Sequence, residues 1–389
     1  MRRIADRARA FVAVLLYTSF TLALLGVAPA AGQKVEPHSF SRSEAQNIVR
    51  EARKITTPHG IEELNAVEIG GVKQWISVRG RDRRNPILLF IHGGAGESEM
   101  PSSWLYQSPW EDYFTVVQWD QRGAGKTGTA GELERMALTL TIPRMVADGE
   151  EMVEYLRKTY GKPKIFVLGH SWGSVIGLSI ARDHPDWLYA YIGMGQMINW
   201  TDNERASYAW TLGQARARGD HEAIRELLSI SPYPEADGST ISRKTILERK
   251  WAIHFGSLVW GRSDYKYLEN AMQFSPEYTD SDLAVRDEQV RLTGKHLYFG
   301  PVDFNGLTKV DCPVFLFVGR YDHQTPGEVA FRWFSKLSAP KKQFVWFEDA
   351  SHELQTEAPG KLLVLLVTDI RPIAQAAGDV PPEEQHTRY

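Results

Sequence analysis

One segment of the sequence combines a hydroxyl nucleophile with a tight turn, namely Gly169-His170-Ser171-Trp172-Gly173. It follows an apolar run of strand length at 165–168 and precedes a helical pattern at 175–183, which is the context that a nucleophile elbow requires. Glycines at both ends let such a strained turn pack against the neighbouring strand and helix. A serine hydroxyl becomes a strong nucleophile only when a base takes its proton. The segment therefore predicts acyl transfer through Ser171, provided that a base and an acid follow.

Two later loops supply an acid and a base in the chain order that nucleophile elbows use. Asp322 lies shortly after the apolar run Val314–Val318, at the carboxyl end of a predicted strand, where open α/β sheets place their sites. His352 follows the run Phe344–Phe347 after a short loop. We predict that His352 is the general base and then the acid for the leaving group, while Asp322 holds the imidazole in one tautomer.

Three other residues of suitable type are alternatives for these roles. His170 adjoins Ser171, but an elbow turns neighbouring side chains away from each other. His323 is the alternative base, since it follows the predicted acid in the same loop. Asp349 is the alternative acid, although it lies too close to His352 in a short loop to be preferred.

A glycine-rich segment, His92-Gly93-Gly94-Ala95-Gly96, follows the apolar run Ile87–Ile91. Such a loop supplies one backbone donor of an oxyanion hole, and the residue after the nucleophile supplies the other. We therefore predict that the N–H groups of Gly94 and Trp172 bind the oxyanion, where loss of one donor typically costs about 2.7–4 kcal/mol in the transition state. The alternative is a glycine turn without a chemical role.

A third glycine-rich segment, from Asp120 to Thr127, ends in Gly-Lys-Thr and so resembles the end of a phosphate-binding loop. The full motif needs a glycine where this chain has Asp120. The spacing therefore excludes nucleotide binding by this segment.

Together these segments resemble the prolyl iminopeptidase family of α/β-hydrolases. The resemblance rests on the glycine loop at 92–96, on Asp120-Gln121-Arg122-Gly123-x-Gly125 and on the elbow, and it covers roughly residues 60–200 and 300–370. It implies the α/β-hydrolase fold, release of an N-terminal residue, often proline, from short peptides, and no metal or organic cofactor. The chain departs from the family pattern at three positions, which hold Ala95, Thr127 and His170 where such enzymes usually carry Pro, Ser and Gly.

The pattern of the remaining chain agrees with that fold. Apolar runs without polar alternation suit strands that are covered on both faces, and helical stretches between them imply a mostly parallel sheet with flanking helices. Residues 195–300 contain helical patterns but no convincing strand, so we predict an inserted helical cap there. The expected division is a signal peptide at 1–30, a hydrolase core at 31–194 and 301–389, and a cap at 195–300.

The cap should decide the substrate, because a peptidase and an esterase share the same core chemistry. An aminopeptidase needs carboxylates near the substrate's ammonium group, since an unpaired buried charge is costly. Glu204 and Glu277 are the candidates, although Glu204 is also explained as the acid of a capping box that begins at Thr201. The alternatives are an esterase for small acyl compounds and a ligand-binding homologue without turnover.

Charge excludes one class of partner. The formal net charge is −3, and residues 1–30 carry four arginines and one aspartate, so their removal leaves −6. A mildly acidic protein has no electrostatic reason to bind nucleic acid. The expected partner is a small molecule or short peptide.

The first thirty residues have the layout of a secretory signal peptide: a basic start, an apolar stretch at 11–27, and Ala28-Pro29-Ala30 as a cleavage site. The alternative is a retained membrane anchor. We expect an exported protein, periplasmic or secreted, that has no membrane attachment after cleavage and begins near Ala31. N-terminal sequencing of protein from its native host tests this, and an intact Met1 in the membrane fraction would support the anchor instead.

Overall fold

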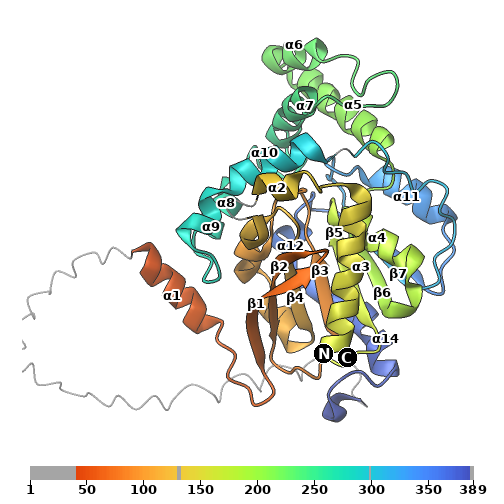
Figure 1. Ribbon diagram of the computed structural model, residues 1–389. Helices are drawn as coiled ribbons and strands as arrows, with labels where there is room; N and C mark the ends of the chain where they lie inside the picture. The colour runs from red at the N-terminus through yellow and green to blue at the C-terminus, as the bar shows by residue number, and fades with distance from the viewer. Residues whose placement is uncertain (1–40, 129–132, 298, 386–389) are drawn as a thin grey trace, which may run out of the picture. The chain divides into compact units, whose positions relative to one another are not determined.

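Eight strands form the sheet of this protein, in the order β1-β2-β4-β3-β5-β6-β7-β8 (Figure 1). The computed structural model describes residues 41–128, 133–297 and 299–385. β1 and β2 pair antiparallel, β2 pairs antiparallel with β4, and all other neighbours are parallel. The predicted α/β-hydrolase architecture is confirmed. The strands are β1 (Ile61–Ile69), β2 (Val72–Gly80), β3 (Ile87–Ile91), β4 (Thr115–Asp120), β5 (Ile165–His170), β6 (Leu188–Met194), β7 (Val314–Gly319) and β8 (Lys342–Phe347).

Both faces of the central strands are apolar because helices cover both. On β3, Ile87, Leu89 and Ile91 contact one hydrophobic cluster, whereas Leu88 and Phe90 contact the other. This is the alternation of side chains that a strand imposes. The apolar runs on β3, β5 and β7 are therefore strands buried between two layers of helices, whereas β8 is an edge strand of which only Phe347 is buried.

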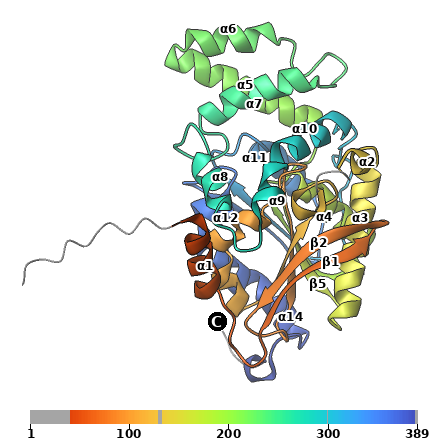
Figure 2. The same ribbon diagram turned by 60° about the vertical axis from the view of Figure 1, so that its left-hand side comes forward.

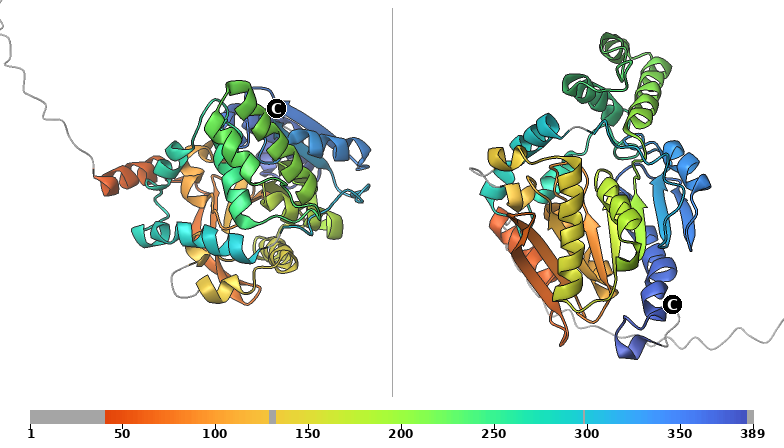
Figure 3. Two further views of the ribbon diagram at one scale, coloured as in Figure 1. Left: turned by 90° about the horizontal axis from the view of Figure 1, so that it is seen from above. Right: turned by 45° about the vertical axis from the view of Figure 1, so that its right-hand side comes forward.

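One layer consists of α3 (Ile142–Thr159), α4 (Gly173–Asp183) and α11 (Gly327–Lys336). The other consists of α12 (Leu354–Glu357), α13 (Pro359–Leu365) and α14 (Arg371–Ala376), with the short helices η1 (Met100–Leu105) and η2 (Ser108–Asp112). Figure 3 shows α3 and α4 in front of the sheet and the C-terminal helices beside it. The two helical layers leave the carboxyl ends of the parallel strands uncovered, and the region between β6 and β7 lies at those ends.

The described part of the segment between β6 and β7 consists of six helices joined by loops and contains no strand. α5, α6 and α7 enclose a small core of their own that includes Ala223, Leu227 and Trp251. Figure 2 shows these three helices farther from the sheet than α8, α9 and α10. The six helices are α5 (Trp200–Arg218), α6 (His221–Ser229), α7 (Ser242–His254), α8 (Lys266–Met272), α9 (Asp280–Ala284) and α10 (Arg286–His296), and we refer to them as the cap.

The predicted capping box at the start of α5 is wrong. The helix begins at Trp200, and the cap is Asn199, whose side chain accepts a hydrogen bond from the N–H of Asp202. Asn199 has the extended backbone of an N-cap residue, and asparagine is among the best N-caps. Glu204 is thereby left without a capping role and lies on the buried side of the helix.

The predicted signal peptide at residues 1–30 lies outside the described residues and stays a prediction. α1 (Arg42–Ala52) is the first element, and it is held to the loop before α9 by bonds such as that from Gln46 to the carbonyl of Ser275 (3.1 Å). Among the described residues, no helix has both the length and the apolar character needed to span a bilayer.

Candidate active site

The predicted nucleophile lies on a sharp turn between β5 and α4. Ser171 has φ = 52°, in the left-handed region that few residues other than glycine adopt. A Cβ atom at position 173 would lie 2.0 Å from the carbonyl oxygen of Ile91, and one at position 169 would lie 2.5 Å from that of Gly173. Only glycine fits at either position. The turn therefore holds Ser171 in a conformation whose strain is on the order of 1–3 kcal/mol.

The predicted acid and base are hydrogen-bonded to each other. Nδ1 of His352 donates to Oδ2 of Asp322 at 2.8 Å, and Oδ1 accepts the N–H groups of Gln324 and Thr325, both at 2.9 Å. Burial would raise the pKa of Asp322, but the charge and hydrogen bond of His352 outweigh it and lower that pKa. Asp322 is therefore an acceptor, and it fixes His352 in the tautomer whose Nε2 is free to take a proton.

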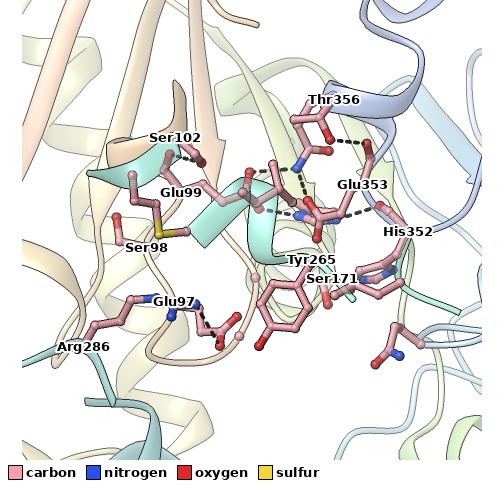
Figure 4. A pocket seen from close by; sticks show the side chains of 18 residues that line it. Glu97, Ser98, Glu99, Ser102, Ser171, Tyr265, Arg286, His352, Glu353 and Thr356 are labelled. Atoms are coloured by element: carbon pink, nitrogen blue, oxygen red, sulfur yellow. Dashed lines mark hydrogen bonds and ion pairs between the residues drawn. The ribbon is translucent and has the colours of Figure 1, made fainter. Parts of the chain in front are cut away.

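Ser171 and His352 line one cavity of about 160 Å³, and Figure 4 shows their side chains next to each other. The glycine loop after β3 lines it too: Gly94 is part of the wall, and a Cβ at Gly93 would lie 2.9 Å from that of Ser171. Trp172 is buried behind the nucleophile, where its indole N–H donates to Gln121 at 3.1 Å. The arrangement brings nucleophile, base, acid and both predicted oxyanion residues into one place, as acyl transfer requires.

The three residues considered as alternatives for the base and the acid make other contacts or face solvent. His323 stacks on Trp210 of α5, with ring centroids 4.0 Å apart. Asp349 is exposed on the loop after β8. His170 is buried, and its two ring nitrogens are engaged by Glu99 and by the carbonyl oxygen of His352.

The two cap carboxylates predicted to bind substrate do not line this cavity, so both assignments are corrected. Glu204 is buried inside the cap, where Arg249 and Tyr233 bond to it. Glu277 pairs with Arg53 of the segment after α1 at 2.7 Å. Each carboxylate is neutralised by a guanidinium that is distant in sequence, and local sequence does not reveal such a partner.

Three other glutamates line the cavity, namely Glu97, Glu99 and Glu353 (Figure 4). Sequence reasoning missed them, although a signal was present. Glu97 and Glu99 directly follow the glycine loop, and Glu353 directly follows His352. Residues adjacent in sequence to assigned site residues lie near the same site, and this adjacency is the signal that pointed to the three glutamates.

A fourth glutamate, Glu357 of α12, holds the loop of the base. Its carboxylate accepts the N–H groups of Ser351 (3.0 Å), Glu353 (3.0 Å) and Trp260 (2.6 Å). The first two flank His352, and the third belongs to the cap. One side chain thereby fixes the backbone on both sides of the base and ties it to the cap.

The sequence profile of the serine aminopeptidase family S33 matches residues 82–359, which include the glycine loop, Ser171, Asp322 and His352. The chain belongs to this family. The predicted resemblance to prolyl iminopeptidase-like α/β-hydrolases is confirmed. The matched residues make up well over half of the chain and include most of the sheet and the whole cap.

Two curated relatives carry names from the same group. The probable aminopeptidase YbaC of Bacillus subtilis (strain 168) is 27% identical over 306 residues, which cover 76% of this chain and 92% of that protein. The probable proline iminopeptidase of Leptolyngbya boryana is 26% identical over 301 residues, which cover 74% and 87%. The crystal structure of the proline iminopeptidase of Mycobacterium smegmatis matches with a TM-score of 0.57 at 16% identity, covering 81% of this chain and 100% of that one, which shows a shared fold.

For this member of the serine aminopeptidase family, Ser171→Ala should abolish hydrolysis without unfolding the chain, because the change removes only the hydroxyl of the predicted nucleophile. Loss of a triad serine removes on the order of 10⁶ in turnover. A fluorophosphonate probe followed by peptide mapping checks the assignment. Wild type should be labelled at Ser171, and so should Ser102→Ala, which changes another serine of the cavity wall. Labelling of Ser171→Ala at any serine would contradict it.

The contact between His170 and Glu99 predicts a basic histidine in this S33 chain. Burial lowers the pKa of His170, but the charge and hydrogen bond of Glu99 outweigh burial and raise it to about 9. Since the unfolded value is about 6.5, protonated His170 stabilises the fold fully below pH 6.5, and this contribution is lost as the pH rises through 9. Glu99→Gln should bring the pKa down.

NMR titration of protein labelled with ¹⁵N-histidine measures this pKa directly. The matched control is Glu348→Gln, which changes an exposed glutamate paired with Arg320. It should leave the His170 midpoint unchanged. A His170 signal that titrates near 6.5 in the wild type would overturn the pairing.

Proposed function

We propose that this protein is an aminopeptidase that releases an N-terminal apolar residue, such as proline, from short peptides. The observation that carries the proposal is the acidic wall of the cavity beside Ser171, formed by Glu97, Glu99 and Glu353. A free N-terminus brings a positive charge to the site, and a buried charge needs a partner of opposite sign. A neutral ester has no such need.

Another part of the cavity wall supports the apolar part of the proposal. Leu258, Leu268 and Met272 line it together with the ring of Tyr265, and all four belong to the cap region. Apolar and aromatic surface of this kind suits a small hydrophobic side chain or a pyrrolidine ring. The cavity thus combines carboxylates with apolar surface. The carboxylates complement the ammonium group of an apolar N-terminal residue, and the apolar surface complements its side chain.

The proposed reaction follows the acyl-enzyme route. Oγ of Ser171 attacks the carbonyl carbon of the N-terminal residue while His352 takes the hydroxyl proton. The N–H groups of Gly94 and Trp172 are the proposed donors to the oxyanion. When the C–N bond breaks, His352 returns the proton to the leaving amine, and water then releases the amino acid by the same steps in reverse. Asp322 stabilises the imidazolium throughout.

A comparison of three substrates tests the proposal: proline p-nitroanilide, its N-acetylated form, and p-nitrophenyl acetate. The protein should cleave the first and reject the second, because acetylation removes the positive charge. We expect a difference in kcat/KM of at least about tenfold, the size expected when a charged hydrogen-bonded contact is lost. Ser171→Ala is the blank for all three.

Other outcomes have definite meanings. Equal cleavage of both anilides, or activity on the ester alone, would replace the aminopeptidase with an esterase or another small-acyl hydrolase. Failure of a folded protein to react even with the fluorophosphonate probe would indicate a ligand-binding homologue without turnover.

A further inference from the structure

Both ring nitrogens of His170 face groups that can only accept hydrogen bonds. Nε2 lies 3.0 Å from the carbonyl oxygen of His352, and Nδ1 contacts the carboxylate of Glu99. The ring can satisfy two acceptors only by donating from both nitrogens, which a histidine does when it is an imidazolium. His170 is 2% exposed, so water does not replace either partner. Geometry alone therefore places a positive charge beside the cavity.

This charge accounts for one of the three glutamates on the cavity wall. Glu99 is paired with His170. Glu97 lies 3.5 Å from Arg286, which is also on the wall. Glu353 has no cation within 4.0 Å in the described part of the chain. Of the carboxylates facing the cavity, Glu353 is therefore the one without an ion pair of its own, and the nearby His170, within 4.8 Å, is already paired with Glu99.

The contacts of Glu353 hold it in place without neutralising it. Its Oε2 accepts a hydrogen bond from Nε2 of Gln355 at 2.6 Å, and the same amide nitrogen lies 3.2 Å from Glu99. Its backbone N–H donates to Glu357 at 3.0 Å. A neutral amide thus bridges two carboxylates and fixes their spacing, while the unpaired one remains open to the cavity.

Glu353 also shares its cavity with the nucleophile that an aminopeptidase substrate must reach. The α-ammonium nitrogen of a peptide is two bonds from the carbonyl carbon that Ser171 attacks. Glu353 is the chain neighbour of His352 and lines the same cavity as Ser171. Resting on the proposed function, we infer that Glu353 binds the substrate's α-ammonium group, and that the Glu99–His170 ion pair is a positioning unit that holds the wall around it.

The electrostatics of Glu353 agree with this assignment. Burial raises the pKa of Glu353 and the attraction of His170 opposes this, but the nearby charges of Glu99, Glu357 and Glu97 add to burial, and the pKa reaches about 8. A carboxyl group that keeps its proton because no cation is paired with it can release that proton when a cation binds. An ammonium group in the cavity would supply the missing positive charge.

A metal ion is the competing occupant. Ligand atoms of Glu99, His170 and Glu353 lie within 4.8 Å of one another, close enough to share an ion. A histidine ligand must present a lone pair to a metal, whereas both nitrogens of His170 face acceptors. The geometry therefore favours an ammonium group, and the experiment includes a test for the ion.

The test uses prolinol, a cationic pyrrolidine alcohol that cannot be hydrolysed, as a probe of the site in the full-length protein. Prolinol should slow fluorophosphonate labelling of Ser171 in the wild type. In Glu353→Gln, the concentration that gives half protection should rise at least about tenfold, the size expected when a charged hydrogen bond is lost. In Glu348→Gln, the exposed control at the start of the same loop, it should stay within about twofold of wild type.

Labelling without prolinol reports whether each variant folds an intact site. The ratio of kcat/KM for proline p-nitroanilide to that for p-nitrophenyl acetate should fall in Glu353→Gln by a similar factor, mainly through KM for the anilide. Equal protection of wild type and Glu353→Gln, or no protection of the wild type, would overturn the inference. So would protection that EDTA removes and Zn²⁺ restores, because the cluster would then be a metal site.

The two proposals fail in different ways. If the wild type cleaves the free-amine anilide and Glu353→Gln retains prolinol protection, the ammonium site is wrong and the aminopeptidase stands. If prolinol protects the wild type through Glu353 while no free-amine anilide is cleaved, the ammonium site stands and the aminopeptidase is wrong.

Discussion

The site depends on one close approach between main chains, where the first residue of α4 packs against the end of β3. Position 173 has no room for a side chain, because the carbonyl oxygen of Ile91 occupies the space that a Cβ would need. The turn that makes this approach contains Ser171 in its left-handed conformation. The side chain of His170, the residue before it, meets Glu99 and the backbone of the base. The nucleophile and the buried histidine beside it thus both belong to a turn that requires glycine at position 173.

The parallel sheet gathers the other groups at the same edge. The loops after β3, β5, β7 and β8 carry the glycine loop, the elbow, Asp322 and His352, and parallel strands end on one side of a sheet. Segments far apart in the sequence therefore meet without any long-range signal beyond strand order. The glutamates on the cavity wall come from two of these loops, so the acidic character of the cavity is part of the core and does not depend on the cap.

This explains which predictions from sequence succeeded. β3 and β7 are recognisable because their side chains are apolar on both faces, and residues placed at strand ends converge by topology. β1 escaped notice because it is an edge strand with several charged and exposed residues, and β6 because tyrosines and glycine interrupt its apolar run. The cap carboxylates were misassigned because Glu204 and Glu277 are neutralised by Arg249 and Arg53, which folding brings from elsewhere in the chain.

The loop of the base is bonded to one short stretch of the cap, residues 256–260. The N–H of His352 donates to the carbonyl of Leu258, the hydroxyl of Ser351 donates to that of Ser257, and Glu357 accepts the N–H of Trp260. α5, α6 and α7, by contrast, are held together by a separate hydrophobic cluster. The cap also contacts the loop of the acid through α5, where Asn203 donates to the carbonyl of Gln324 at 2.8 Å and Trp210 stacks on His323. A graft that replaces cap helices must therefore reproduce two sets of contacts, one that supports the imidazole and one that supports the loop of its carboxylate partner.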